Sequence, residues 1–174
     1  MAICDMIVET ADVADTQRLG NRCARLLRPG DVLALSGDLG TGKTAFTQGL
    51  ALGLGIARVV TSPTFVLVNE YPLPDGHSLQ HVDCYRLADA PLEMWDVGLG
   101  DLVAGDDIVV IEWAERVAEL LPKTYLEVHF TYVGENRRQL CFVAYGAHYT
   151  RVVEELFQVA APGGQADLGQ YVLP

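Results

Sequence analysis

Residues 37–44 have the composition and spacing of a phosphate-binding loop. They read Gly-Asp-Leu-Gly-Thr-Gly-Lys-Thr and fit the pattern G-x-x-x-x-G-K-[ST]. Glycines let the backbone wrap closely around a phosphate group, so that its N–H groups point at phosphate oxygens. In this pattern the lysine places its charge on the β- and γ-phosphates, and the final hydroxyl takes a position on Mg²⁺. The loop predicts binding of ATP or GTP through Asp38, Leu39, Gly40, Thr41, Gly42, Lys43 and Thr44.

Two carboxylates at the ends of predicted strands are candidates for the rest of a phosphoryl-transfer site. Glu112 follows the apolar run 108–111, as the acidic residue of a Walker B strand does. Asp83 lies in a second strand, where alternation puts it on the same face as His81. Such a site needs an acidic partner for Mg²⁺ and a group that orients the nucleophile. His81 alone is more typical of a strand histidine with satisfied hydrogen bonds. The catalytic candidates are therefore Lys43, Asp83 and Glu112, and the metal candidates are Thr44 and Glu112.

A loop with two hydroxyl side chains, Ser62-Pro-Thr-Phe65, lies between the helix after the phosphate loop and the next predicted strand. In nucleotide switches, a Ser or Thr hydroxyl in such a loop senses the γ-phosphate or Mg²⁺. A simple turn that enters a strand explains the same residues. The sequence pattern leaves both interpretations open.

Several classes of phosphate-loop protein are disfavoured by missing motifs. No Asp has Gly three positions later, and no Asn is followed by Lys, so the D-x-x-G and N-K-x-D motifs of translational and Ras-like GTPases are absent. Small-molecule kinases use arginine-rich lids, whereas the arginines here are sparse and dispersed along the sequence. An ATPase is favoured, with a small-molecule kinase or a non-hydrolysing nucleotide switch as the alternatives.

The predicted elements alternate between strands and helices around the phosphate loop. A buried strand at 31–36 precedes the loop and a helix from 43 to about 54 follows it, as the motif requires. Residues 1–159 are expected to form one domain, and residues 160–174 a flexible tail. The other predicted strands are 4–9 and 108–111, together with two hairpins, one of 65–71 with 79–85 and one of 125–133 with 138–145. The other predicted helices are one capped by Asp12 that runs to about Leu27, one from Pro91 to Asp96, a short one that ends at Leu121, and one at 152–159.

The composition of the chain indicates which kinds of partner and which cellular location to expect. The 174 residues include 12 Lys and Arg against 23 Asp and Glu, a net charge of −11, which disfavours autonomous nucleic-acid binding. No apolar run is long enough for a membrane span, and the N-terminus lacks a basic region followed by an apolar one, so a cytoplasmic location is expected. The four scattered cysteines are expected to be reduced thiols: Cys4, Cys23, Cys84 and Cys141.

Five motifs in this order resemble the TsaE (YjeE) family over about residues 5–145. They are Ser36–Thr44, Ser62–Phe65, Val68–Tyr71, His81–Leu87 and Ile111–Glu115. The resemblance implies a single α/β P-loop NTPase domain with a mixed, largely parallel central sheet flanked by helices. It also implies binding of ATP or ADP with Mg²⁺ and slow ATP hydrolysis by the isolated protein.

The resemblance further implies partners and a process. Members of the family act with the TsaB and TsaD proteins, which transfer a threonylcarbamoyl group to N6 of adenosine 37 in tRNAs that read ANN codons. ATP hydrolysis is expected to reset that assembly between turnovers, without forming the new bond. Contact with tRNA is expected only through the partner proteins, which agrees with the acidic composition.

Roles for single residues follow from the resemblance by position. Lys43 and Thr44 become ligands of phosphate and Mg²⁺, and Glu112 becomes the acidic partner of Mg²⁺, directly or through water. Asp83 becomes a catalytic acid that positions water or metal. Thr64 becomes the switch hydroxyl.

Two further residues and a loop are expected near the nucleotide. Trp113 would pack beside the nucleotide or a partner, with plain core packing as the alternative. Arg137 would lie near the adenine, with a solvated hairpin charge as the alternative. The loop around residues 13 and 14 would also touch the base.

Overall fold

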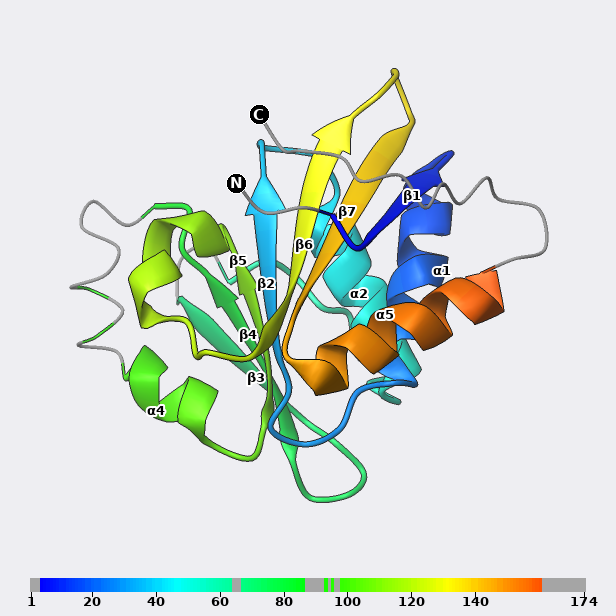
Figure 1. The fold of residues 1–174 in the computed structure, drawn as a ribbon. Helices are drawn as coiled ribbons and strands as arrows, with labels where there is room; N and C mark the ends of the chain where they lie inside the picture. Colours follow the sequence, from blue (N-terminus) through cyan, green and yellow to red (C-terminus); the bar gives the residue numbers. More distant parts are fainter. Residues whose placement is uncertain (1–3, 64–66, 87–92, 94, 96–97, 161–174) are drawn as a thin grey trace.

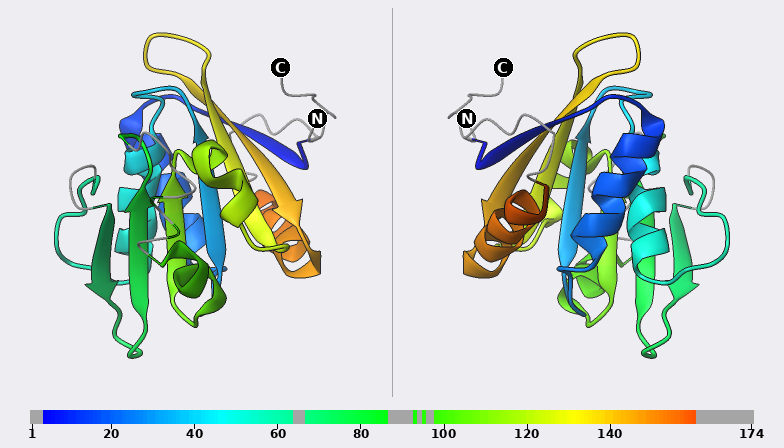
Figure 2. Two further views of the ribbon diagram at one scale, coloured as in Figure 1. Left: turned by 90° about the vertical axis from the view of Figure 1, so that its left-hand side faces the viewer. Right: turned by 90° about the vertical axis from the view of Figure 1, so that its right-hand side faces the viewer.

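A seven-stranded sheet forms the centre of the protein in the computed structural model, which describes residues 4–63, 67–86, 93, 95 and 98–160. Helices lie on both of its faces (Figures 1 and 2). One face packs against α1 (Val13–Ala24), α2 (Lys43–Gly53) and α5 (Ala147–Ala160). The other face packs against α4 (Leu99–Ala104) and the 3₁₀ helix η1 (Ala114–Leu120).

The sheet is mixed, as predicted, with the order β1-β7-β6-β2-β5-β4-β3. Its four central strands, β6, β2, β5 and β4, are parallel, and the three outer pairings are antiparallel. The parallel part is limited to these strands because β3–β4 and β6–β7 are the two predicted hairpins, whose strands must run in opposite directions. The strands are β1 (Met6–Thr10), β2 (Val32–Gly37), β3 (Val68–Pro72), β4 (Ser78–Asp83), β5 (Ile108–Glu112), β6 (Tyr125–Tyr132) and β7 (Arg138–Tyr145).

The central strands are apolar on both faces because both faces are covered. In β2, Leu33 and Leu35 belong to the core beneath α1, α2 and α5. Their neighbours Val32 and Ala34 belong to the core beneath α4 and η1. This burial explains the continuous apolar run of β2, which is typical of parallel strands between two helical layers. The polar residues of the site must therefore lie at the carboxyl ends of these strands.

Helices α1 and α2 pack against each other at unusually close range. A Cβ atom added to Gly49 would lie 1.9 Å from the Gln17 carbonyl oxygen, and one on Gly20 would lie 2.2 Å from the Phe46 oxygen. Gly53 is similarly confined by the backbone of α1. The missing side chains let the two backbones meet, so α2, the helix after the phosphate loop, is held firmly against α1.

The local predictions are confirmed at most elements. Asp12 caps α1, where its side chain accepts a hydrogen bond from the Asp15 N–H at 2.7 Å. The helix predicted at 152–159 begins earlier, because Gly146 (φ 106°) directly follows β7 and its carbonyl accepts from the Thr150 N–H in the first turn. The sequence pattern did not predict α4. The helix predicted at 91–96 and the strand start at 65 lie largely outside the described residues, and so does the tail after Ala160.

The expectation of four free thiols is wrong for one pair. Cys4 and Cys141 form a disulfide with a Cα–Cα distance of 5.6 Å, because β1 pairs with β7 and brings the N-terminal segment beside Cys141. Cys23 and Cys84 are buried free thiols, as predicted. No helix in the described ranges has the length and apolarity needed to cross a lipid bilayer.

Candidate nucleotide-binding site

The loop between β2 and α2 has the backbone that the glycine pattern predicts. Gly37, Gly40 and Gly42 have φ angles of 122°, 79° and 108°, a region that L side chains rarely adopt. Gly37 also has no room for a side chain, since a Cβ atom would lie 2.3 Å from the Phe130 oxygen. No side chain caps the first turn of α2. Its N–H groups and the positive end of its dipole therefore suit an anion at this loop.

Lys43 is buried at the base of the loop. It is 4% exposed, and its Nζ donates to the carbonyl oxygens of Gly37 at 2.5 Å and Asp38 at 2.8 Å. Burial lowers the pKa of its ammonium group, and nearby carboxylates act in the opposite direction. These carboxylates belong to Glu112, Glu115, Asp83 and Asp38. Lys43 is therefore a partly desolvated cation whose donors now face carbonyl oxygens of its own loop.

Glu112 ends β5 and is fixed by side chains from two other elements. Its Oε2 accepts from the Thr44 hydroxyl of α2 at 2.8 Å, and its Oε1 accepts from His81 Nε2 of β4 at 2.8 Å. Thr47, one turn further along α2, reaches the same carboxylate at 3.5 Å. Both His81 and Glu112 are almost fully buried. The carboxylate is therefore held next to the hydroxyl that the loop motif assigns to Mg²⁺.

Asp83 ends β4 directly opposite Glu112 in the register of the parallel pair. Its carboxylate accepts from the hydroxyl of Ser62 and from the Tyr85 N–H, the latter at 2.9 Å. The side chain is 3% exposed but lines the cavity beside the phosphate loop. The two acidic candidates thus lie at the ends of neighbouring strands.

Trp113 closes one side of the phosphate loop. Its backbone is left-handed (φ 60°, ψ 40°), a conformation that costs such a residue about 1–3 kcal/mol and that concentrates at functional sites. Its ring lies 4.0 Å from Lys43 Nζ and 4.9 Å from the Tyr85 ring, measured to the ring centroids. The ring therefore contacts the loop cation, while the partly buried Trp113 also packs against the core beneath α4 and η1.

A cavity of about 610 Å³ brings most predicted site residues together. Asp38 and Thr41 belong to the loop but do not line the cavity: the Thr41 hydroxyl donates to the Asp38 backbone carbonyl at 2.8 Å, and Asp38 is exposed. Thr64 lies outside the described residues. Arg137 is not brought to the cavity and forms an exposed ion pair with Glu9. The cavity is lined by Val13, Leu39, Gly40, Gly42, Lys43, Thr44, Ala45, Ser62, Asp83, Tyr85, Arg86, Glu112, Trp113 and Arg138.

Arg138 is the clearest residue that the sequence analysis missed. It lines the cavity, is 9% exposed, and its Cδ is 3.4 Å from the position of a Cβ atom on Gly42. Its buried Nε has no hydrogen-bond partner among the residues that the structure describes. Arg137 is the last residue of the loop between β6 and β7, and Arg138 is the first residue of β7. The predicted strand start at residue 138 separates the two arginines, but it does not indicate which of them faces the cavity.

The oxygen donors of the site suit magnesium. The Thr44 hydroxyl and the Glu112 carboxylate are 2.8 Å apart and are hard ligands of the kind that Mg²⁺ takes. Within the described ranges, no cluster of three or more His, Cys, Asp or Glu side chains could hold a metal ion. This agrees with a site in which nucleotide phosphates and water supply the remaining oxygens, as is usual for Mg²⁺.

Comparisons with known proteins agree on one family. The family described as "Threonylcarbamoyl adenosine biosynthesis protein TsaE" matches residues 10–140. The tRNA threonylcarbamoyladenosine biosynthesis protein TsaE of Bacillus subtilis (strain 168) is 41% identical over 148 residues, which cover 84% of this chain and 90% of that protein. The TsaE protein of Streptomyces coelicolor is 48% identical over 113 residues, or 64% of this chain and 76% of that protein. The crystal structure of YdiB from Bacillus subtilis superposes with a TM-score of 0.77 at 34% identity, covering 92% of this chain and 99% of that one.

Proposed function

The chain belongs to the TsaE family, whose name places it in threonylcarbamoyl adenosine biosynthesis, and we propose that it is the ATP-binding and ATP-hydrolysing subunit of that system. It acts with TsaB and TsaD, which threonylcarbamoylate N6 of adenosine 37 in tRNAs that read ANN codons. ATP hydrolysis resets this assembly between turnovers in the cytoplasm. The net charge of −11 supports contact with tRNA through the partner proteins.

One observation carries the proposal: the phosphate loop, Glu112 and Asp83 meet at one edge of the sheet. Glu112 and Asp83 are paired in register, and Glu112 is bonded to the last residue of the loop motif, Thr44. A nucleotide-binding loop with two carboxylates at adjacent strand ends is the arrangement that phosphoryl transfer to water needs. A loop that only bound phosphate would not require the second carboxylate.

Each residue has a distinct task in this proposal. Lys43 exchanges its bonds to the Gly37 and Asp38 carbonyls for phosphate oxygens and neutralises their charge. Thr44 and Glu112 would hold Mg²⁺, which would supply further charge neutralisation on the phosphates. Asp83 orients the attacking water through its carboxylate and accepts its proton.

Phosphate release by the purified chain, with and without TsaB and TsaD, tests the proposal. We expect slow release that the two proteins stimulate. Transfer of phosphate to an added metabolite would instead indicate a small-molecule kinase. Binding without turnover in the presence of both proteins would indicate a nucleotide switch.

Lysine substitution tests the nucleotide site itself. Lys43→Ala should weaken ATP binding by about 1.5–3 kcal/mol, which is the contribution of a charge-assisted contact. Lys123 is the only other lysine in the sequence and is exposed. Lys123→Ala should therefore leave ATP affinity unchanged. Equal affinity of both variants would refute the assignment of the loop.

A further inference from the structure

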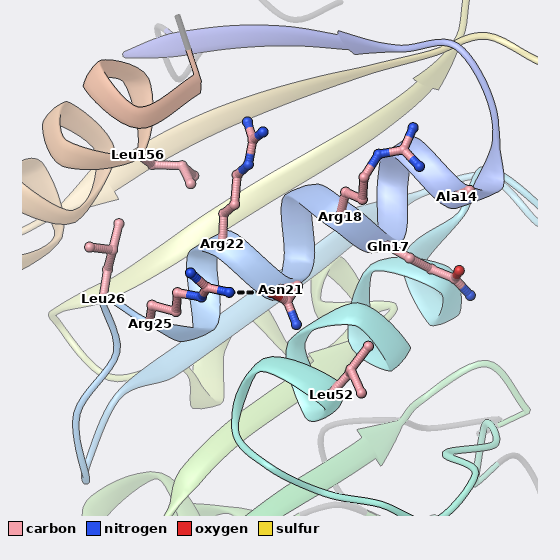
Figure 3. Close-up of a pocket in the computed structure, with 9 residues that line it drawn as sticks. All are labelled: Ala14, Gln17, Arg18, Asn21, Arg22, Arg25, Leu26, Leu52 and Leu156. Carbon is pink, nitrogen blue, oxygen red and sulfur yellow. Dashed lines mark hydrogen bonds between the residues drawn. The ribbon is translucent and has the colours of Figure 1, made fainter. Parts of the chain in front are cut away.

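The outer face of α1 concentrates positive charge on an otherwise acidic protein. Four of the ten arginines fall within residues 18–28, with no acidic residue between them. The arginines are otherwise dispersed along the sequence, and α1 with the four residues after it is the exception. Arg18, Arg22 and Arg25 all line one groove, in which the side chains of Arg18 and Arg22 extend from the same side of the helix (Figure 3).

The groove has a volume of about 660 Å³ and is formed by α1, α2 and α5 (Figure 3). Leucines from all three segments line it: Leu26 just after α1, Leu52 of α2 and Leu156 of α5. Leu52 is 66% exposed and presents apolar area at the edge of the groove, whereas Leu156 is buried at its base. None of the described residues that line the groove is acidic. The groove thus combines guanidinium groups with exposed apolar area.

The charge of the groove is only partly neutralised within the chain. Arg18 forms an ion pair with Asp15. Arg25 donates to the amide oxygen of Asn21 at 3.4 Å, a neutral acceptor. Within the described ranges, neither Arg22 nor Arg25 has a carboxylate at salt-bridge distance. Guanidinium groups remain charged and present planar donors that match carboxylates in pairs.

We propose that this groove docks an acidic, leucine-bearing segment of a partner protein. Carboxylates of the segment would pair with Arg22 and Arg25, and its aliphatic side chains would cover the exposed Leu52 and the partly buried Leu26. RNA is the less suitable occupant, because a phosphate backbone has no aliphatic groups for the leucines.

The groove is separate from the nucleotide cavity, since the two share no lining residue. The inference therefore does not depend on ATP hydrolysis. It goes beyond the proposed enzymatic function and can fail or succeed independently of it.

A labelled peptide of Glu-Glu-Leu repeats, titrated against the full chain by fluorescence anisotropy, tests the proposal. The double variant Arg22→Glu/Arg25→Glu should bind the peptide at least about tenfold more weakly, because two favourable charge contacts become repulsive. Arg151→Glu is the matched control, since Arg151 is exposed on α5 and does not line the groove. It should change the affinity by less than about twofold. ATP affinity of the double variant should equal that of the wild type, which also shows that it folds.

Matched probes separate the possible outcomes. Peptides with Gln in place of Glu, or with Ala in place of Leu, should each bind more weakly than the original. If the double variant does not fold, Arg22→Gln/Arg25→Gln removes the charge with less disturbance and should still weaken binding. No binding at about 1 mM peptide, or equal binding by all variants, would overturn the proposal. Tighter binding of an RNA oligonucleotide that the same variants abolish would also overturn it, in favour of an RNA surface.

Discussion

The two carboxylates of the site lie at neighbouring strand ends, and different kinds of hydrogen-bond partner hold each of them in place. Glu112 at the end of β5 is fixed by His81 of β4 and Thr44 of α2, both of which belong to regular elements. Asp83 at the end of β4 is fixed by Ser62 and the Tyr85 N–H, both of which lie outside regular elements. Their exposure is equal, at 3% each, so among the residues that the structure describes the difference lies in their partners.

This difference fits the two tasks. A metal ligand must keep a constant position. The Glu112 carboxylate does so because its hydrogen-bond partners belong to a strand and a helix of the core. A group that orients water must respond to what occupies the cavity, and partners in loops allow that. We therefore expect Glu112 to govern metal-dependent binding and stability, and Asp83 to govern the chemical step alone.

The largest effect is expected for Glu112→Ala. Mg²⁺-dependent turnover should fall by at least about 100-fold, because the metal loses its only carboxylate ligand in this proposal. The free energy of unfolding should also fall by about 1–3 kcal/mol, since His81 and Thr44 lose their buried acceptor. Phosphate release and urea unfolding measure the two effects. Glu119→Ala, at an exposed position of η1, is the control and should change neither. Turnover that survives in Glu112→Ala would contradict the assignment of β5 as the Walker B strand.

A smaller and more selective effect is expected for Asp83→Asn. Turnover should fall by about 10- to 100-fold, because the amide cannot accept a proton from water. Stability should change by less than about 1 kcal/mol, since the amide oxygen still accepts one hydrogen bond. ATP affinity with Mg²⁺ should stay within a few-fold of the wild type, measured by calorimetry. Asp106→Asn, at an exposed position, is the control. A loss of Mg²⁺-dependent affinity in Asp83→Asn would exchange the roles of the two carboxylates.

His81 tests whether the fixed position of Glu112 matters. His81→Phe removes the Nε2 donor and should raise the Mg²⁺ concentration needed for half-maximal ATP binding about tenfold, as loss of a second hydrogen-bond partner does at metal sites. His81→Gln keeps an N–H donor and should restore most of the affinity. Equal behaviour of the two variants would mean that His81 only fills space in the core.

The sequence alone predicts the parts of the site that depend on local spacing. The loop glycines, Lys43 and Thr44 lie within eight consecutive residues, and Glu112 follows directly on its apolar strand. The role of His81 depends on the register of β4 against β5, which places it within 2.8 Å of Glu112 and which no local pattern reveals. Asp83 lacks such a signal: the predicted strand ran to residue 85, whereas β4 ends at Asp83.

The remaining differences also come from contacts between distant segments. Ser62 contacts Asp83, although Thr64 had been assigned the switch role in that loop. The disulfide joins cysteines 137 positions apart and follows from the pairing of β1 with β7, which the sequence does not specify. Arg137 and Arg138 are adjacent in the sequence, and only the tertiary fold places Arg138 at the cavity and Arg137 in an ion pair with Glu9.

The pKa of Lys43 reports how strongly the negative charges of Glu112 and Asp83 each act on the Lys43 ammonium group. Burial lowers this pKa, and Glu112 opposes the shift more than Asp83 does. Glu112→Gln should therefore lower the pKa further than Asp83→Asn. Since the pKa of the folded state is below its ordinary value, the unfolded state binds more protons over the interval between the two values. The contribution of Lys43 to the free energy of unfolding should thus rise with pH across that interval. Selective labelling and NMR titration resolve Lys43, with Lys123 as the internal control. Equal shifts in both variants would contradict the ranking.

The smallest effect is expected at Cys84, the residue after Asp83. Burial raises its pKa to about 12, and the Asp83 charge adds to the shift. Burial likewise raises the pKa of Cys23 to about 12, with Asp31 as the contributing charge. The thiolate is the reactive form, so both thiols should react slowly at pH 8 and faster as the pH rises.

Asp83→Asn should accelerate labelling of Cys84 by only about two- to threefold, because it removes a secondary contribution to the pKa and leaves burial unchanged. Labelling of Cys23 should not change in that variant, and neither thiol should respond to Glu112→Gln. Mass spectrometry of the alkylated peptides measures both rates in one sample. A Cys84 response to Glu112→Gln as large as that to Asp83→Asn would mean that the two strand ends act as one electrostatic unit.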